Sequence, residues 1–331
     1  MIDSAIVGLG RWGRGHVKSM QLAGEARPLR FVRAIDPALD AHRAFCDEHG
    51  MQLSASLDDA LGDPGIHAIV LCTPHSLHRS QVEACARAGK PVFCEKPLAL
   101  TLEDARAMIE ACRQAKVPLG VGHLRRFWPS MEAVRQAIDA GEIGELLHVE
   151  GHFSNEHSNN VVGGWRESPA ESPAAGLTGA GLHIVDAFTL LVGPALSVHA
   201  HVVERKAPPA PLDTIAALYR LDAGGGRQVS GMFASVRASP LYWRVHAFGS
   251  RGSIEALGEH DVVRHSSGAA PVRTVLPPRE AMRYQLECFA RTVRGEAAPS
   301  IPFSDLLATV ASFEATVQSV ETGRTVHVAR T

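Results

Sequence analysis

The chain has 331 residues, of which 45% are hydrophobic and 21% are charged, and its formal net charge is −2. Single cores usually stop growing below this length, so two domains are expected. The charges form neither a basic block nor an acidic tail, which argues against nucleic acid or a membrane surface as partner. No apolar run is long enough to span a membrane. A strand expected directly after Met1 leaves no room for a signal peptide, so the expected location is cytoplasmic.

The cysteines and histidines do not form a recognisable metal or disulfide pattern. No cysteine pair has C-x-x-C spacing, and most of the six lie in apolar segments, which favours buried reduced thiols. His199 and His201 lie two residues apart on one predicted strand face, but no third ligand follows at a convincing spacing. We therefore expect no metal site. The cysteines are Cys46, Cys72, Cys85, Cys94, Cys112 and Cys288.

A glycine-rich turn lies close to the N-terminus. A short apolar strand over residues 5–7 leads into Gly8-Leu9-Gly10-Arg11-Trp12-Gly13, and a helix is expected from about residue 14 to residue 23. In a dinucleotide-binding turn the first glycine permits the tight bend. The second lets the backbone approach a pyrophosphate, and the third lets helix and strand pack closely. The helix N-terminus then presents N–H groups to the phosphates.

The context of this turn decides how it is interpreted, because a lone G-x-G-x-x-G is common in a chain with 30 glycines. A second strand over residues 29–35 ends at Asp36, 23 residues after Gly13. A carboxylate at that place can accept both hydroxyls of an adenine ribose and repels a 2′-phosphate. The pattern therefore predicts NAD, with NADP as the less favoured cofactor.

Strands and helices then alternate as far as residue 122. The apolar run 67–72 is typical of a parallel strand covered on both faces, and it ends in a loop with Thr73, Pro74 and His78. The strand over 91–94 ends in Glu95-Lys96-Pro97, and a further strand covers 117–122. This alternation predicts a doubly wound parallel sheet, whose ligands bind at the carboxyl ends of the strands.

The regular alternation of strands and helices ends after residue 145. Strands are expected over 146–153, 197–205, 214–221, 228–236 and 243–248, several of them alternating as in a sheet with one buried face. One helix begins near Gly181, and two more cover 278–294 and 303–321. We predict a dinucleotide-binding domain over 1–123 and a second α/β domain over 124–331. It stays open whether the C-terminal helix packs back on the first domain.

An ordered set of motifs resembles the glucose–fructose oxidoreductase / inositol dehydrogenase / MocA-like family. Besides the glycine turn, the set comprises Thr73-Pro74…His78, Glu95-Lys96-Pro97, Gly122-His123-Leu124-Arg125-Arg126-Phe127, Trp165-Arg166, Gly181-Leu182-His183-Ile184-Val185-Asp186 and Gly249-Ser250-Arg251-Gly252-Ser253. The resemblance implies a Rossmann domain followed by an α/β domain with a large open, mostly antiparallel sheet. One sheet face often forms the subunit contact in that family, and the active site lies between the domains.

The resemblance also implies roles for individual residues. Lys96 would touch the nicotinamide ribose and the substrate, and His183 would exchange a proton with the substrate hydroxyl. Trp165 and Arg166 would lie near cofactor and substrate. The remaining cofactor-binding residues would be Gly8, Gly10, Arg11, Trp12, Gly13, Asp36, Thr73, Pro74, His78, Glu95 and Pro97.

One position departs from the family pattern. Many members carry an aspartate four residues before the histidine, and this chain has Gly179 there. Thr178 could fill the space with a hydroxyl, or Asp186 could orient the ring from the same helix. Inositol-type polyol dehydrogenation loses some support through this change.

The chemistry expected of such a site is hydride transfer from a carbinol, which needs a base for the hydroxyl proton and a cation for the developing alkoxide. His183 and Lys96 can supply these, although a solvated lysine and a structural histidine are the alternatives. Substrate contacts are expected from a second group, for which surface-loop or interdomain ion-pair roles stay open: Arg126, Asn155, His157, Thr178 and Asp186.

The leading interpretation is an NAD-dependent oxidoreductase that acts on a hydroxyl or carbonyl of a sugar, a polyol or a related small molecule. One alternative is a glycoside-cleaving enzyme that oxidises its substrate transiently with bound NAD. Another is a nucleotide-sensing regulatory protein without turnover, which the presence of Lys96 and His183 disfavours. Alternating strands over 197–248 leave one sheet face to be covered, so a homodimer or homotetramer is expected.

Overall fold

The computed structural model describes residues 1–21, 27–156, 164–165, 168–174, 176–203 and 214–331. These residues form two compact units. The first unit comprises Met1–Ala99, Glu103–Leu124 and Glu280–Phe303; the second comprises Leu100–Leu102, Arg125–Arg279 and Ser304–Thr331. Segment 280–303 therefore lies with the first unit, whereas the sequence interpretation placed it in the second domain.

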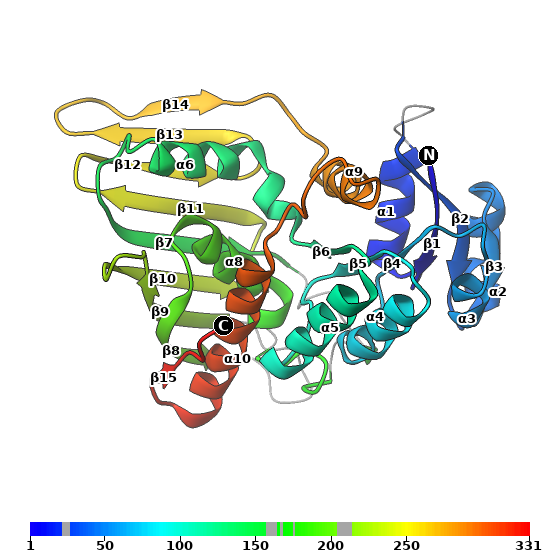
Figure 1. The fold of residues 1–331 in the computed structure, drawn as a ribbon. Coiled ribbons are helices and arrows are strands. Elements are labelled where there is room, and N and C mark those ends of the chain that lie inside the picture. The colour runs from blue at the N-terminus through cyan, green and yellow to red at the C-terminus, as the bar shows by residue number, and fades with distance from the viewer. Residues whose placement is uncertain (22–26, 157–163, 166–167, 175, 204–213) are drawn as a thin grey trace. The chain divides into compact units, whose positions relative to one another are not determined.

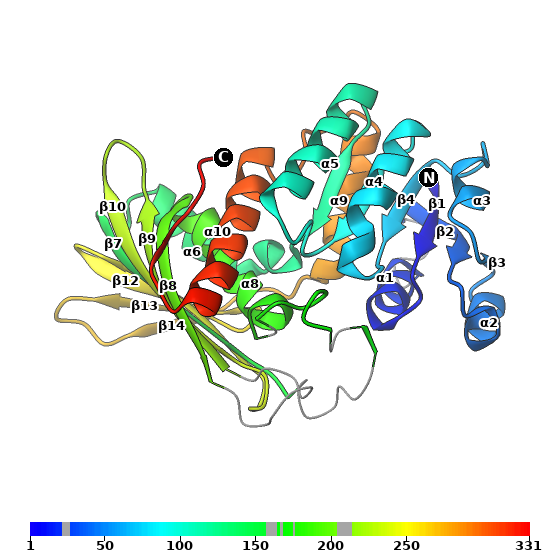
Figure 2. The same cartoon turned by 90° about the horizontal axis from the view of Figure 1, so that it is seen from below.

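The first unit is a doubly wound sheet of six parallel strands in the order β3-β2-β1-β4-β5-β6, as predicted. Helices α1 and α9 pack side by side and contact β2, and α4 and α5 lie next to each other (Figure 2). The elements are β1 (Ile2–Val7), α1 (Arg11–Gln21), β2 (Leu29–Ile35), α2 (Leu39–Glu48), β3 (Gln52–Ser54), α3 (Asp58–Leu61), β4 (Ala68–Leu71), η2 (His75–Leu77), α4 (His78–Arg87), β5 (Val92–Glu95), α5 (Leu102–Ala115), β6 (Leu119–Gly122) and α9 (Ala281–Val293).

The core of the first unit joins residues from both ends of the chain. Val17 and Met20 of α1 are buried in one cluster with Leu286 and Phe289 of α9. Gly120 on β6 makes room for this packing, because a Cβ there would lie 2.8 Å from the Phe289 ring. Helix α9 is therefore an integral layer of the first unit.

The second unit holds a sheet of nine strands in the order β14-β13-β12-β11-β7-β10-β9-β8-β15 (Figure 1). Among the residues described, neighbouring strands of this sheet pair antiparallel, except that β7 and β10 pair parallel. The elements are η3 (Leu124–Phe127), α6 (Pro129–Asp139), β7 (Leu146–Ser154), η5 (Leu177–Gly181), α8 (Leu182–Leu191), β8 (Ala195–Val203), β9 (Thr214–Asp222), β10 (Gln228–Val236), β11 (Tyr242–Gly249), β12 (Gly252–Leu257), β13 (Asp261–Ser266), β14 (Val272–Val275), α10 (Phe303–Thr322) and β15 (Val326–His327).

Helices cover one face of this second sheet. Figure 2 shows α6, α8 and α10 on the same side, and Tyr219 of β9 hydrogen-bonds Thr316 of α10 at 2.6 Å. On the opposite face Leu218 and Met232, which pair across β9 and β10, are 57% and 43% exposed. The alternation that the sequence predicts for these strands is therefore confirmed. Among the residues described, no helix is long and apolar enough to cross a membrane.

Candidate functional site

The turn after β1 leaves its backbone open at the start of α1. Gly8 has φ +89°, and a Cβ there would lie 2.7 Å from the Cys72 carbonyl oxygen. A Cβ on Gly13 would lie 1.9 Å from the Gly8 oxygen, so only glycine allows α1 this close to β1. By contrast, no atom lies within 4 Å of the Cβ position at Gly10. Beside the N–H groups of Arg11 and Trp12 this open backbone fits a pyrophosphate.

Asp36 lies directly after β2 and faces the glycine turn. Its Oδ2 accepts the Leu9 N–H at 2.9 Å, and its Oδ1 accepts the Ala38 N–H at 3.0 Å. His42 Nε2 lies 3.4 Å from Oδ1. The sequence interpretation missed His42 and also Arg14, which lies 2.9 Å from the His42 ring, because neither belongs to a motif. The carboxylate is thus fixed where the ribose of a dinucleotide is expected.

Loops after β4 and β5 meet at His78. This buried ring lies with Nδ1 2.9 Å from the Pro97 carbonyl oxygen and Nε2 3.2 Å from that of Thr73. Burial lowers the pKa of His78, and the contacts with the carbonyls offset this only in part. The Thr73 hydroxyl donates to Gln81 Oε1 at 2.6 Å. His78 therefore holds the Thr73-Pro74 loop against the loop that carries Lys96, which is half-buried directly after β5.

In the second unit, His183 lies buried on α8, and its ring packs edge-on to Phe153 of β7 with centroids 5.8 Å apart. Asn155, which follows β7, is buried as well. The Thr178 hydroxyl donates to the Pro173 carbonyl at 2.5 Å, which commits its proton to the backbone. His183 and Lys96 belong to different units, so their joint action on one substrate stays a prediction.

The space at Gly179 is filled by an arginine that the sequence interpretation missed. A Cβ on Gly179 would lie 2.9 Å from Cζ of Arg237, a buried residue that follows β10. Gly179 belongs to the π-helical turn η5, one turn before His183. A side chain at position 179 would therefore have to displace the guanidinium of Arg237.

Arg126 and Asp186, both predicted to contact substrate, bind each other. Arg126 donates to both Asp186 oxygens at 2.8–3.0 Å and to Asp305 Oδ2 at 2.7 Å. The Arg126 and Asp186 side chains are 5% and 4% exposed. This geometry favours a structural role for the pair.

Arg125, next in sequence, lies among aromatic rings. Its Cζ is 4.1 Å from the ring centroids of Trp128 and Phe153 and 4.5 Å from that of Trp243. Burial lowers the pKa of Arg125 to about 9. The Arg125 guanidinium thus stacks on Phe153, the same ring that contacts His183.

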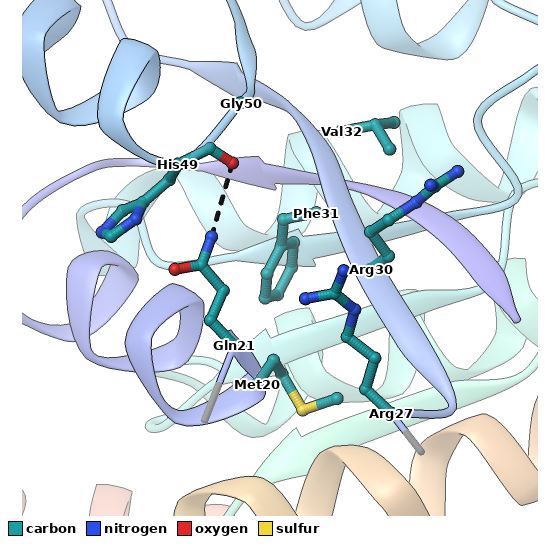
Figure 3. Close-up of a pocket in the computed structure, with 8 residues that line it drawn as sticks. All are labelled: Met20, Gln21, Arg27, Arg30, Phe31, Val32, His49 and Gly50. Carbon is teal, nitrogen blue, oxygen red and sulfur yellow. Dashed lines mark hydrogen bonds between the residues drawn. The ribbon is translucent and has the colours of Figure 1, made fainter. Parts of the chain in front are cut away.

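Two predicted residues, His157 and Arg166, lie outside the residues that the structure describes, and Trp165 is half-buried. A cavity of about 200 Å³ (Figure 3) is lined by none of the predicted site residues. It sits where the parallel strands begin, and there Gln21 Nε2 donates to the His49 carbonyl at 3.4 Å. Because Gly8, Asp36 and Lys96 follow strand ends, this cavity is not the candidate dinucleotide site.

Known proteins resemble this chain over almost its whole length. A 1,5-anhydro-D-fructose reductase of Ensifer adhaerens is 30% identical over 307 residues, covering 90% of each chain. An inositol 2-dehydrogenase of Rhizobium meliloti (strain 1021) is 29% identical, covering 98% of each. The fold of a levoglucosan dehydrogenase, solved with NADH and levoglucosan, matches with a TM-score of 0.88 over 99% of this chain and 100% of that one, at 21% identity.

Two family models together cover most of the chain. Residues 2–123 match the oxidoreductase family with an NAD-binding Rossmann fold, GFO_IDH_MocA, and residues 131–255 match the GFO/IDH/MocA C-terminal domain. The open glycine turn and the fixed Asp36 carboxylate fit the dinucleotide that this family binds. The chain therefore belongs to the GFO/IDH/MocA family of NAD-binding oxidoreductases.

Proposed function

We propose that this protein is an NAD(H)-dependent dehydrogenase or reductase that acts on a carbinol or carbonyl carbon of a sugar or polyol, in the cytoplasm. The observation that carries the proposal is the assembly, at one edge of the first sheet, of the open glycine turn, Asp36 and Lys96. Relatives that reduce 1,5-anhydro-D-fructose or oxidise inositol support the substrate class.

The proposed chemistry divides between Lys96 and His183. NAD, when bound, supplies the hydride acceptor. The Lys96 ammonium stabilises the negative charge that develops on the substrate oxygen, and His183 takes the hydroxyl proton. His183 suits this role because a neutral imidazole nitrogen can accept a proton and return it.

The experiment that tests the function is a panel of sugars and polyols, followed through NADH absorbance in both directions. It includes myo-inositol, scyllo-inositol, levoglucosan, D-apiose and 1,5-anhydro-D-fructose. Net turnover of cofactor with at least one compound is expected. Glycoside cleavage without net NADH release would instead support the transient-oxidation alternative, and NAD binding without any turnover would support the regulatory one.

Replacing Asp36 by alanine should weaken NAD binding about tenfold or more, because a hydrogen bond to a charged group contributes roughly 1.5–3 kcal/mol. Asp36→Asn is the matched control. Its amide oxygen can still accept the Leu9 N–H, but the charge that repels a 2′-phosphate is gone, so the preference for NAD over NADP should fall. Fluorescence titration measures both affinities. Tighter binding of NADP than of NAD by the unmodified protein would contradict the assignment.

We also propose that the chain forms a closed homodimer or homotetramer through the open face of the second sheet. Leu218 and Met232 expose apolar surface there, and such patches usually mark interfaces. Light scattering should give a multiple of 35.4 kDa, and Leu218→Glu should shift the mass toward one chain. A monomer at micromolar concentration would count against this arrangement.

A further inference from the structure

A buried carboxylate lies beneath the glycine turn. Glu95 is the last residue of β5, and its side chain is 7% exposed. Its Oε1 lies 2.7 Å from Nε2 of His16, a fully buried residue of α1. Its Oε2 accepts the backbone N–H of Lys96 at 3.1 Å. One carboxylate thus joins the helix that begins at the glycine turn to the peptide that carries the proposed catalytic lysine.

The surroundings hold this carboxylate in one position. Gly122 of β6 pairs with Glu95, and a Cβ on Gly122 would lie 2.7–2.8 Å from the carboxyl atoms. The ring of Phe93 meets the His16 ring edge-on, with centroids 5.9 Å apart. The carboxylate and the imidazole are thus both closely packed, which restricts their movement.

The electrostatics keep Glu95 ionised in this buried place. Burial raises the pKa of Glu95, but the hydrogen bond and charge of His16, together with Lys96, outweigh it and hold the pKa below its ordinary value. The Cys72 and Cys94 thiols nearby stay protonated, since burial and the charge of Glu95 raise their pKa values well above the ordinary one. Removing His16 would therefore leave a buried charge without its main partner, which proteins rarely tolerate in place.

We propose that His16 is a positioning residue for Lys96, and that it acts through Glu95 by fixing the Lys96 peptide relative to the glycine turn. The proposal rests on the function proposed above, in which Lys96 acts on the reacting oxygen. It explains why a carboxylate is buried where an apolar residue would pack at lower cost. His16 itself touches neither substrate nor cofactor in this scheme.

The first test needs no substrate. Hydrogen exchange of the Lys96 amide, resolved by NMR in the protein without NAD, reports directly on the bond to Glu95. His16→Leu should speed exchange at Lys96 about tenfold or more, whereas His16→Gln, which retains an N–H donor, should restore most of the protection. Val17→Ala is the matched control, because Val17 is the next residue on α1 and equally buried. It should lower the melting temperature without changing exchange at Lys96.

The second test uses the panel compound with the highest rate. His16→Leu should lower kcat about tenfold while the NAD dissociation constant changes less than threefold. Glu95→Leu, which removes the acceptor, should have a similar effect, and the double variant should lose no more than the larger single loss, since both changes break one linkage. Unchanged Lys96 exchange in His16→Leu, or strictly additive losses in kcat, would overturn the proposal. A native rate for Lys96→Ala would refute the catalytic role instead, and the exchange result would still decide whether His16 fixes the peptide.

Discussion

Replacing Lys96 by alanine should slow hydride transfer by about 10²–10⁴-fold, the range that a positioned acid–base group typically contributes. The affinity for NAD should change little, because the glycine turn and Asp36 hold the other end of the cofactor. Single-turnover reduction of NAD with the best panel compound measures the rate without interference from product release.

His183→Ala should slow hydride transfer by a comparable factor. The rate loss in the double variant Lys96→Ala with His183→Ala should be smaller than the product of the two single losses, since both residues serve one proton transfer. Thr178→Val is a control in η5, the turn that precedes α8, because the Thr178 hydroxyl already donates to the Pro173 carbonyl. A His183→Ala enzyme with a near-native rate would assign the proton to another group, and Asn155 and its neighbours would be the next residues to replace.

Arg126→Met should lower the free energy of unfolding by about 3–5 kcal/mol, because it removes the cation that is hydrogen-bonded to the buried Asp186 carboxylate. Asp186 is 4% exposed and receives three of the Arg126 hydrogen bonds. The Thr309 hydroxyl also lies 3.3 Å from the same carboxylate, but it is neutral and cannot replace the charge of the guanidinium. Urea unfolding followed by circular dichroism measures the loss.

The chain offers a matched surface pair as the control. Arg113 binds Glu110 through two bonds of 2.7–2.8 Å, but these side chains are 68% and 45% exposed. Arg113→Met should therefore lower the free energy of unfolding far less than Arg126→Met does, because solvent screens an exposed pair. The double variant Arg126→Met with Asp186→Leu should recover part of the free energy of unfolding that Arg126→Met alone loses. Equal effects at Arg113 and Arg126 would mean that burial does not decide the strength of these pairs.

Strong periodic signals allowed much of the fold to be predicted. The strands over 29–35 and 228–236 match the structure residue for residue. The second alternates cleanly between buried and more exposed positions, and the first opens with the same alternation. The glycine turn could be predicted because its spacing follows from backbone sterics.

Elements without such a signal were missed. Strand β14 is exposed at every position, and β13 does not alternate cleanly, so neither shows a pattern of period two. Strand β12 begins at Gly252, within a glycine- and serine-rich stretch that is typical of turns. Helix α6 was missed as well, although it opens on Pro129.

The contacts that define the candidate site are long-range. His16 reaches Glu95 across 79 residues, and Arg126 reaches Asp186 across 60. No local pattern records such pairings, since they exist only once strands and helices are packed. The motif around Glu95-Lys96-Pro97 could therefore be found in the sequence, whereas the histidine that holds its carboxylate could not.

The discontinuity of the first unit constrains how the protein is made. A growing chain that has reached residue 124 possesses all six strands of the parallel sheet, but not α9, whose Leu286 and Phe289 complete the core. The apolar surface that Leu286 and Phe289 cover in the folded protein stays exposed to solvent until the ribosome has added more than 150 further residues. A truncated protein that ends at residue 124 would lack α9 and would leave this apolar surface exposed. Joining residues 280–303 to residue 124 through a flexible linker should cover the surface again.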